Sequence, residues 1–137
     1  MKLFKYTFLP IFLAGSWIGL SEFIRNDIFL KDYWSDHYEN LAVVFPYEPI
    51  NGAVWAIWSY CFAIAIFIIS KRFDFLQTTI LSWFVGFVMM WLVVWNLGVL
   101  PPGLLYYAIP LSIVEVIVAL WVIRWFQDKG GRKMYDV

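Results

Sequence analysis

A chain of 137 residues has room for about one domain, yet 63% of its residues are hydrophobic and only 15% are charged. A soluble domain of this size has too much surface to bury so much apolar side chain, so the composition indicates a protein solvated by lipid. The 10 basic and 10 acidic residues cancel, which argues against a nucleic-acid partner. The single cysteine, Cys61, excludes an intramolecular disulfide and a cysteine-based metal site.

Four apolar segments approach the ~20 residues that a helix needs to cross ~30 Å of hydrocarbon. In chain order they cover residues 6–24, 52–70, 76–98 and 104–126. The third must end at Pro101, since the Pro-Pro-Gly sequence there cannot continue a helix. A signal peptide is the alternative for the first segment, but its apolar stretch is long for one. The pattern predicts an all-α fold in which residues 1–137 form one membrane domain, an antiparallel bundle of four transmembrane helices.

The positions of lysine and arginine predict the orientation of the bundle. Two basic residues, Arg25 and Lys31, fall on one side, and eight fall on the other: Lys2, Lys5, Lys71, Arg72, Arg124, Lys129, Arg132 and Lys133. Basic residues gather on the cytoplasmic side of membrane proteins. We therefore expect a protein of the cytoplasmic (inner) membrane with both termini in the cytoplasm, an outer loop over residues 25–51 and a cytoplasmic tail over residues 127–137.

The outer loop combines apolar and acidic residues in a way that favours a short helix over residues 27–41. One face would carry Ile28, Leu30, Tyr33, Trp34 and Leu41, and acidic residues would occupy another. An amphipathic helix of this kind is typical of the membrane surface. We expect an interfacial helix there, followed by an extended segment that contains Pro46 and Pro49.

Each apolar segment has a stripe of small or polar residues at helical spacing, which favours close packing between helices in lipid. The expected inward stripes are Gly15, Gly19, Glu22 and Asn26; Ala56, Ser59 or Tyr60, and Ala63; Ser82, Gly86, Met89, Val93 and Asn96; and Ala108, Ser112, Glu115 and Ala119. The Gly-x-x-x-Gly pair of the first stripe has a second interpretation, a face for dimerisation. These stripes predict one compact bundle.

Glu115 is the strongest candidate for a functional residue, since its position in the fourth segment places it near the bilayer centre. An ionised carboxylate there costs several kcal/mol, so the position needs an explanation. One interpretation is a proton- or cation-binding carboxylate; the other is a protonated acid that hydrogen-bonds a neighbouring helix. We expect no lysine, arginine or histidine within the membrane as a partner for Glu115. Ser112, one turn earlier, belongs to the same candidate site.

A second group of polar residues lies at the outer ends of the predicted helices. If the stripes face inward, these residues converge on an outward-opening pocket above Glu115 that suits a small hydrophilic or cationic ligand. The alternative is ordinary interfacial polarity at helix ends. The group consists of Glu22, Arg25, Asn26, Asn51 and Asn96.

His37 is the single histidine and has Asp36 beside it. A metal site from these two residues is a weak candidate, because their spacing matches no common metal motif and a solvated acidic face explains it as well. The absence of a histidine within the membrane excludes bis-histidine haem ligation in one chain. We expect no metal and no cofactor.

The stretch Gly15-Ser16-Trp17, followed by Phe29-Leu30-Lys31-Asp32-Tyr33-Trp34, resembles small bacterial inner-membrane proteins. Those proteins have four helices, with a Gly–Trp first helix and a Phe–Lys–Trp loop. The resemblance implies a four-helix architecture and no activity.

Three classes of function fit these observations, and whether the chain is an enzyme stays open. The first is an accessory or scaffold subunit of a membrane complex, favoured by size, aromatic richness and the absence of motifs. The second is a small transporter or channel component that uses Glu115. The third is a membrane-embedded enzyme acting on a lipophilic substrate. The expected partners are the lipid bilayer and further copies of the chain or other subunits.

Overall fold

The computed structural model describes residues 4–135, with side chains up to residue 129. Lys2 and the side chains of Arg132 and Lys133, which entered the charge count above, lie outside this description. Every element of the described chain is helical, and four helices are long and apolar enough to cross a membrane. These findings confirm the all-α class and the four predicted membrane helices.

The four long helices are Phe4–Phe29, Pro49–Ile69, Phe75–Asn96 and Leu105–Lys129. The elements that form them are η1 (Phe4–Phe8), α1 (Leu9–Phe23), η2 (Ile24–Phe29), α3 (Pro49–Ile69), α4 (Phe75–Trp83), η3 (Phe84–Val88), α5 (Met89–Asn96) and α6 (Leu105–Tyr135), where η marks a π-helical segment. The helix α6 continues beyond Lys129 to Tyr135. The short helix expected in the first loop is present as α2 (Lys31–Asn40). The first long helix continues through η2 instead of ending at residue 24.

Local sequence signals explain where two of the helices begin. At the start of α3, Pro49 occupies the first turn, and Glu48 and Asn51 form a reciprocal capping box. The start predicted at residue 52 is therefore three residues too late. At the start of α4, the side chain of Asp74 accepts from the backbone N–H of Gln77 at 2.8 Å. Both caps satisfy backbone groups that the first helical turn leaves free.

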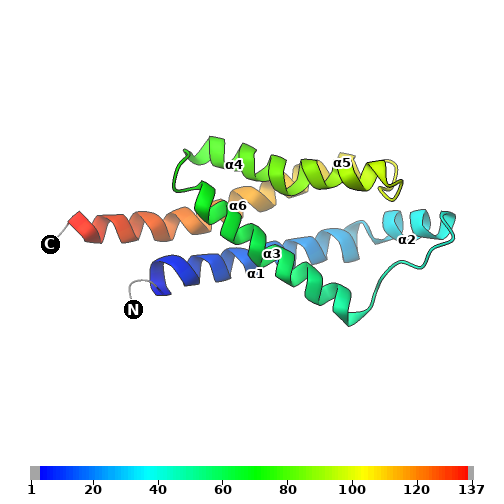
Figure 1. Cartoon of the computed structure of the whole chain (residues 1–137), viewed down its shortest axis with the longest axis horizontal. Helices are drawn as coiled ribbons and strands as arrows, with labels where there is room; N and C mark the ends of the chain where they lie inside the picture. Colours follow the sequence, from blue (N-terminus) through cyan, green and yellow to red (C-terminus); the bar gives the residue numbers. More distant parts are fainter. Residues whose placement is uncertain (1–3, 136–137) are drawn as a thin grey trace.

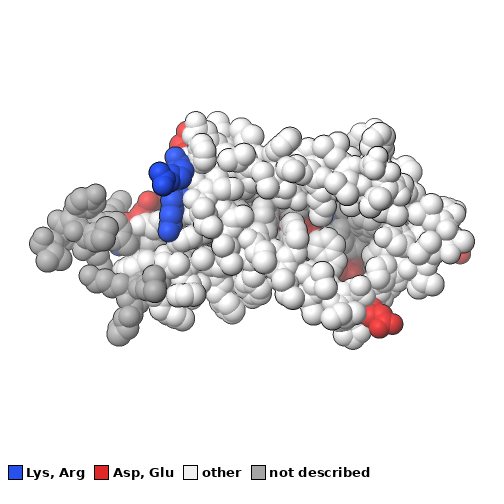
Figure 2. All heavy atoms as spheres, viewed as in Figure 1, with Lys and Arg blue, Asp and Glu red and all other residues white. Residues whose placement is uncertain are grey.

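The helices α1, α4, α5 and α6 run along the long axis of the molecule, and α3 crosses them obliquely (Figure 1). α1 packs against both α3 and α6, and α4 packs against α6. The start of α1, the turn between α3 and α4 and the C-terminal part of α6 lie toward one end, whereas α2 and the turn between α5 and α6 lie toward the other (Figure 1). On the face shown in Figure 2, charged side chains are concentrated near these ends, and the surface between them is almost entirely uncharged.

The glycine stripe of α1 packs inside the chain. A Cβ atom added to Gly15 would collide with the ring of Tyr60, and one added to Gly19 would touch Ser59. Both neighbours belong to α3. The two glycines therefore allow α3 to approach α1 closely, and this face is not free for a second copy of the chain.

The stripe expected on α3 is correct only in its second half. Ser59 and Ala63 are buried, but Ala56 is exposed. Ala56 is exposed because α3 crosses α1 obliquely, so that the N-terminal turns of α3 diverge from the other helices (Figure 1).

The predicted inward face of the third helix is correct at its start and wrong at its end. Ser82 is buried and Gly86 packs against Phe62, but Met89, Val93 and Asn96 are exposed. The buried positions there are Phe87 and Trp91. The π-helical segment η3 accounts for the change, since each π-turn adds a residue and rotates the following turns relative to a regular α-helix. On α6 the expected stripe is buried throughout, at Ala108, Ser112, Glu115 and Ala119.

Candidate functional site

Two carboxylates bind the same guanidinium group in the interior of the bundle. Nη1 of Arg25 donates to Oε2 of Glu115 at 2.9 Å, and Nη2 of Arg25 donates to Oε1 of Glu22. Glu115 is completely buried, and Arg25 and Glu22 are each 4% exposed. Both ion pairs are thus shielded from water, where charge-assisted hydrogen bonds are strong and an unpaired charge is costly.

One face of the first long helix is directed at Glu115. Trp17, Ser21 and Arg25 follow each other at intervals of four, so they lie on one side of the helix. The indole N–H of Trp17 donates to the backbone carbonyl of Glu115 at 3.1 Å, and the Ser21 hydroxyl donates to Oε2 at 2.9 Å. Together with Arg25, these contacts fix the rotation of α1 relative to α6.

The hydrogen bonds continue from Glu22 to α2. Nδ2 of Asn26 donates to Oε2 of Glu22 at 2.8 Å, and the indole N–H of Trp34 donates to Oδ1 of Asn26 at 3.1 Å. We call the connected set the Arg25 network; it comprises Ser21, Glu22, Arg25, Asn26, Trp34 and Glu115. The centre of the Arg25 guanidinium also lies 5.1 Å from the ring centroid of Phe87, a cation–π contact with η3. The network therefore links elements of the first and fourth long helices to α2 and η3.

The expectation that Glu115 has no basic partner within the bundle is wrong. The predicted end of the first segment at residue 24 places Arg25 in the outer loop. In the structure the helix continues through η2 to Phe29. Arg25 therefore stays within the helical segment, and its long side chain reaches Glu115.

One buried oxygen atom of the network has no hydrogen-bond partner among the described residues. Oε2 of Glu115 accepts two hydrogen bonds, whereas Oε1 of Glu115 is buried and has no hydrogen-bond partner among the described residues. A buried polar atom without a partner destabilises a fold, so its presence needs an explanation. Oε1 is therefore the atom of the network that is free to bind a proton or to accept a further hydrogen bond.

The remaining candidates from the outer polar group do not join the network. Asn51 is part of the capping box of α3, where its Oδ1 accepts from the backbone N–H of Glu48 at 3.1 Å. Asn96 is exposed at the end of α5. Ser112 is buried, but it accepts from the indole N–H of Trp83 at 2.9 Å and donates to the carbonyl of Ile109 at 2.9 Å. It joins the third and fourth long helices at a separate contact.

His37 and Asp36 lie on α2 at the end of the molecule. Nε2 of His37 lies 3.0 Å from the carbonyl oxygen of Gly98 in the α5–α6 turn. Among the described residues, no three histidine, cysteine, aspartate or glutamate side chains gather where they could hold a metal ion. The contact with Gly98 gives His37 a role in holding α2 against this turn.

Sequence reasoning missed Ser21 and Trp34 as members of the network. A signal for Ser21 was present, because the spacing Trp17–Ser21–Arg25 places three hydrogen-bond donors on one helical face. Trp34 was assigned to an apolar membrane-facing surface, and its indole N–H is the reason that it faces Asn26 instead.

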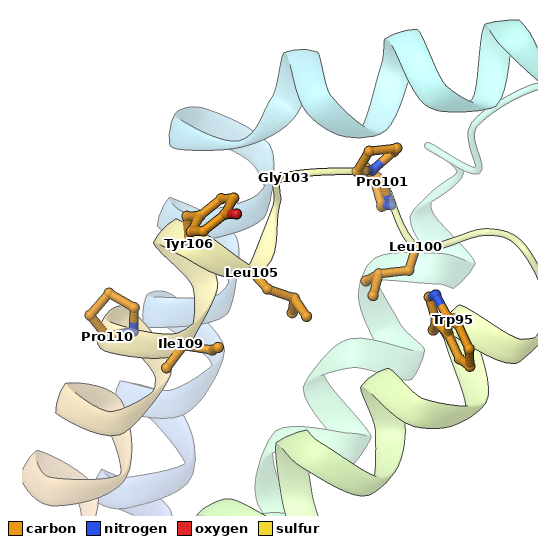
Figure 3. A pocket seen from close by; sticks show the side chains of 9 residues that line it. Trp95, Leu100, Pro101, Gly103, Leu105, Tyr106, Ile109 and Pro110 are labelled. Atoms are coloured by element: carbon orange, nitrogen blue, oxygen red, sulfur yellow. The ribbon is translucent and has the colours of Figure 1, made fainter.

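A separate cleft of about 570 Å³ opens between α5 and the start of α6. Figure 3 shows its walls, with Trp95 and Leu100 on one side and Tyr106, Ile109 and Pro110 on the other. Its lining does not include a residue of the Arg25 network.

Comparison with known proteins gives no family, no curated relative and no solved structure that matches this chain. The functional argument therefore rests on the residues themselves.

Proposed function

We propose that this chain is a scaffold or accessory subunit of a larger membrane complex. In this proposal the four long helices cross the cytoplasmic membrane in antiparallel order with both termini in the cytoplasm. The short helix α2 then lies on the outer surface, which agrees with its place in Figure 3, across the end of the bundle. The excess of basic residues at the opposite ends of the helices supports this orientation.

The observation that carries the proposal is the internal pairing of the Arg25 network. A site that binds a charged substrate directs its charged groups toward a space that the substrate can enter. Here the guanidinium of Arg25 is instead bound by Glu22 and Glu115 of the same chain, and Asn26 is bound by Glu22 and Trp34. Such contacts stabilise helix association and fix its geometry, as a scaffold requires.

The surface along α5 is suited to a partner. Trp91 is its one buried residue, and its outward side chains are large and apolar: Met89, Leu92, Val93 and Trp95. The cleft between α5 and α6 continues this surface. In lipid, a second helix gains from filling such a cleft by van der Waals contact. We therefore propose an apolar transmembrane helix of another subunit as the partner on α5.

The test compares two surface variants at matched exposure. Val93 on α5 and Ile57 on α3 are 58% and 64% exposed. The tagged chain is purified in mild detergent from native membranes at native expression. The proposal expects a stoichiometric second subunit that Val93→Trp loses and Ile57→Trp retains. A wild-type chain that purifies alone, as a monomer or as a homo-oligomer, contradicts it, and so does equal retention of the subunit in both variants.

A second candidate function is a proton-coupled transporter or channel component, which the unpartnered Oε1 of Glu115 favours. For this candidate, the purified chain in liposomes conducts protons under a membrane potential, and Glu115→Gln abolishes the flux while the protein stays folded. Absence of flux in the wild type, or unchanged flux in the variant, rules it out.

A further inference from the structure

The buried network contains more acidic than basic groups. Glu22 and Glu115 bring two carboxyl groups, and Arg25 brings one guanidinium. With both carboxylates ionised, the buried cluster has a formal charge of −1. An uncompensated charge within a membrane costs several kcal/mol, whereas one proton on either carboxyl group makes the cluster neutral.

Among the described side chains, no basic group other than Arg25 forms an ion pair with Glu22 or Glu115. Of the helices that pack against α6, α3 and α4 have no charged residue and α1 has only Glu22. The segment η1 also packs against α6 and contains Lys5, which lies 17 positions before Glu22 at the far end of the first long helix. The other titratable groups of these helices lie elsewhere: Cys61 of α3 is exposed, and the hydroxyl group of Tyr60 lies 3.0 Å from that of Ser16. From η3 the neighbour is the uncharged ring of Phe87.

The geometry also brings the two carboxyl groups close together. They bind opposite terminal nitrogens of the same guanidinium, Glu115 at Nη1 and Glu22 at Nη2. Two carboxyl groups in one buried site are not readily ionised together, and such pairs share a proton. Oε1 of Glu115 can bind that proton, because it has no hydrogen-bond partner among the described residues while Oε2 already accepts from Ser21 and Arg25.

We propose that the Glu22–Glu115 pair holds one proton at neutral pH, so that the Arg25 network is a neutral, proton-binding site in the centre of the bundle. The proton belongs to the pair and not to one of its members, because interacting groups titrate together. The inference does not depend on the scaffold role. The transporter candidate requires such a site, but the site can exist without proton flux.

Infrared spectroscopy of the full-length protein tests the proposal directly. The chain has four glutamates, at positions 22, 39, 48 and 115. Glu39 and Glu48 are exposed at the protein surface and serve as references for the two buried glutamates. The protein is labelled with ¹³C in the glutamate carboxyl groups and studied in a maltoside micelle, which has no carbonyl group of its own.

At pH 7 we expect a protonated carboxyl band, equivalent to one group per chain, that moves to lower frequency with the label. A labelled protein that shows carboxylate bands alone overturns the proposal. Because this measurement uses the wild type, it decides the question even if variants of the buried residues fail to fold.

Three variants then identify the glutamates that give rise to the protonated carboxyl band. Glu115→Gln and Glu22→Gln should each remove it, since the remaining carboxylate balances Arg25 without a proton. Glu39→Gln, the exposed control, should leave its intensity unchanged. A band that survives in both buried variants also overturns the proposal, because the proton would then be held outside the pair.

Discussion

Arg25 and Glu115 are 90 positions apart in the sequence, and Nη1 of Arg25 donates to Oε2 of Glu115 at 2.9 Å with both side chains buried. The pair connects the first long helix to the last. In lipid, apolar burial alone does not hold helices together, so polar contacts and close packing determine their arrangement.

Replacement of Gly15 by alanine should destabilise the bundle, because the added Cβ collides with the ring of Tyr60 on α3. Overpacking of this kind costs about 1–3 kcal/mol. Gly52 is the control, since an added Cβ there meets nothing within 4 Å. Unfolding by SDS in mixed micelles should require less SDS for Gly15→Ala than for the wild type and about the same amount for Gly52→Ala. Equal stability of the two variants would show that α1 and α3 do not pack through Gly15.

Replacement of Trp34 by phenylalanine should loosen α2. The variant keeps an aromatic ring but loses the indole N–H that donates to Asn26 at 3.1 Å. Loss of a hydrogen bond worth about 1 kcal/mol corresponds to roughly fivefold faster local opening. Hydrogen exchange should accelerate in Lys31–Asn40 and stay unchanged in Trp55→Phe, a tryptophan that is 45% exposed on α3. Unchanged exchange of α2 in Trp34→Phe would mean that the network does not hold this helix.

Labelling of single cysteines in intact cells tests the proposed orientation. In a Cys61→Ser background, Val44→Cys places a thiol in the loop after α2, where the side chain is 90% exposed. Arg72→Cys places one in the exposed turn between α3 and α4. A membrane-impermeant maleimide should label the first variant in intact cells and the second only after lysis. The reverse pattern would place the termini outside.

Hydropathy was sufficient to predict the four long helices, because each contains enough consecutive apolar residues to cross a membrane. The end of the first helix was missed because Arg25, Asn26 and Asp27 are polar and were assigned to a loop. The side chains of Arg25 and Asn26 are accommodated inside the helical segment because they bind Glu22, Glu115 and Trp34. Hydropathy cannot reveal such pairing, since it sums residues along one segment and ignores the partner.

The site could be predicted only in part for a related reason. Glu115 and Glu22 stood out because carboxyl groups are rare at these depths. The Arg25–Glu115 contact depends on the rotation of the first long helix against α6, which no local pattern specifies. The burial of Phe87 and Trp91 in place of Met89 and Val93 depends on η3, a π-helical segment that periodicity alone does not predict.

A double-mutant cycle between Arg25 and Glu115 tests most directly whether the buried ion pair holds the first and fourth helices together. Arg25→Gln leaves two buried carboxyl groups without their cation and should cost about 3–5 kcal/mol of stability. In the wild type, Glu115→Gln should destabilise the protein less than Arg25→Gln does, because Glu22 still balances Arg25. In the Arg25→Gln background, Glu115→Gln should have no cost or should stabilise the protein, because it removes a carboxyl group that has lost its cation. We therefore predict that the effect of Glu115→Gln differs between the two backgrounds by more than about 1 kcal/mol in SDS unfolding. Effects that agree within about 0.5 kcal/mol would contradict the pairing, since independent sites add in this way.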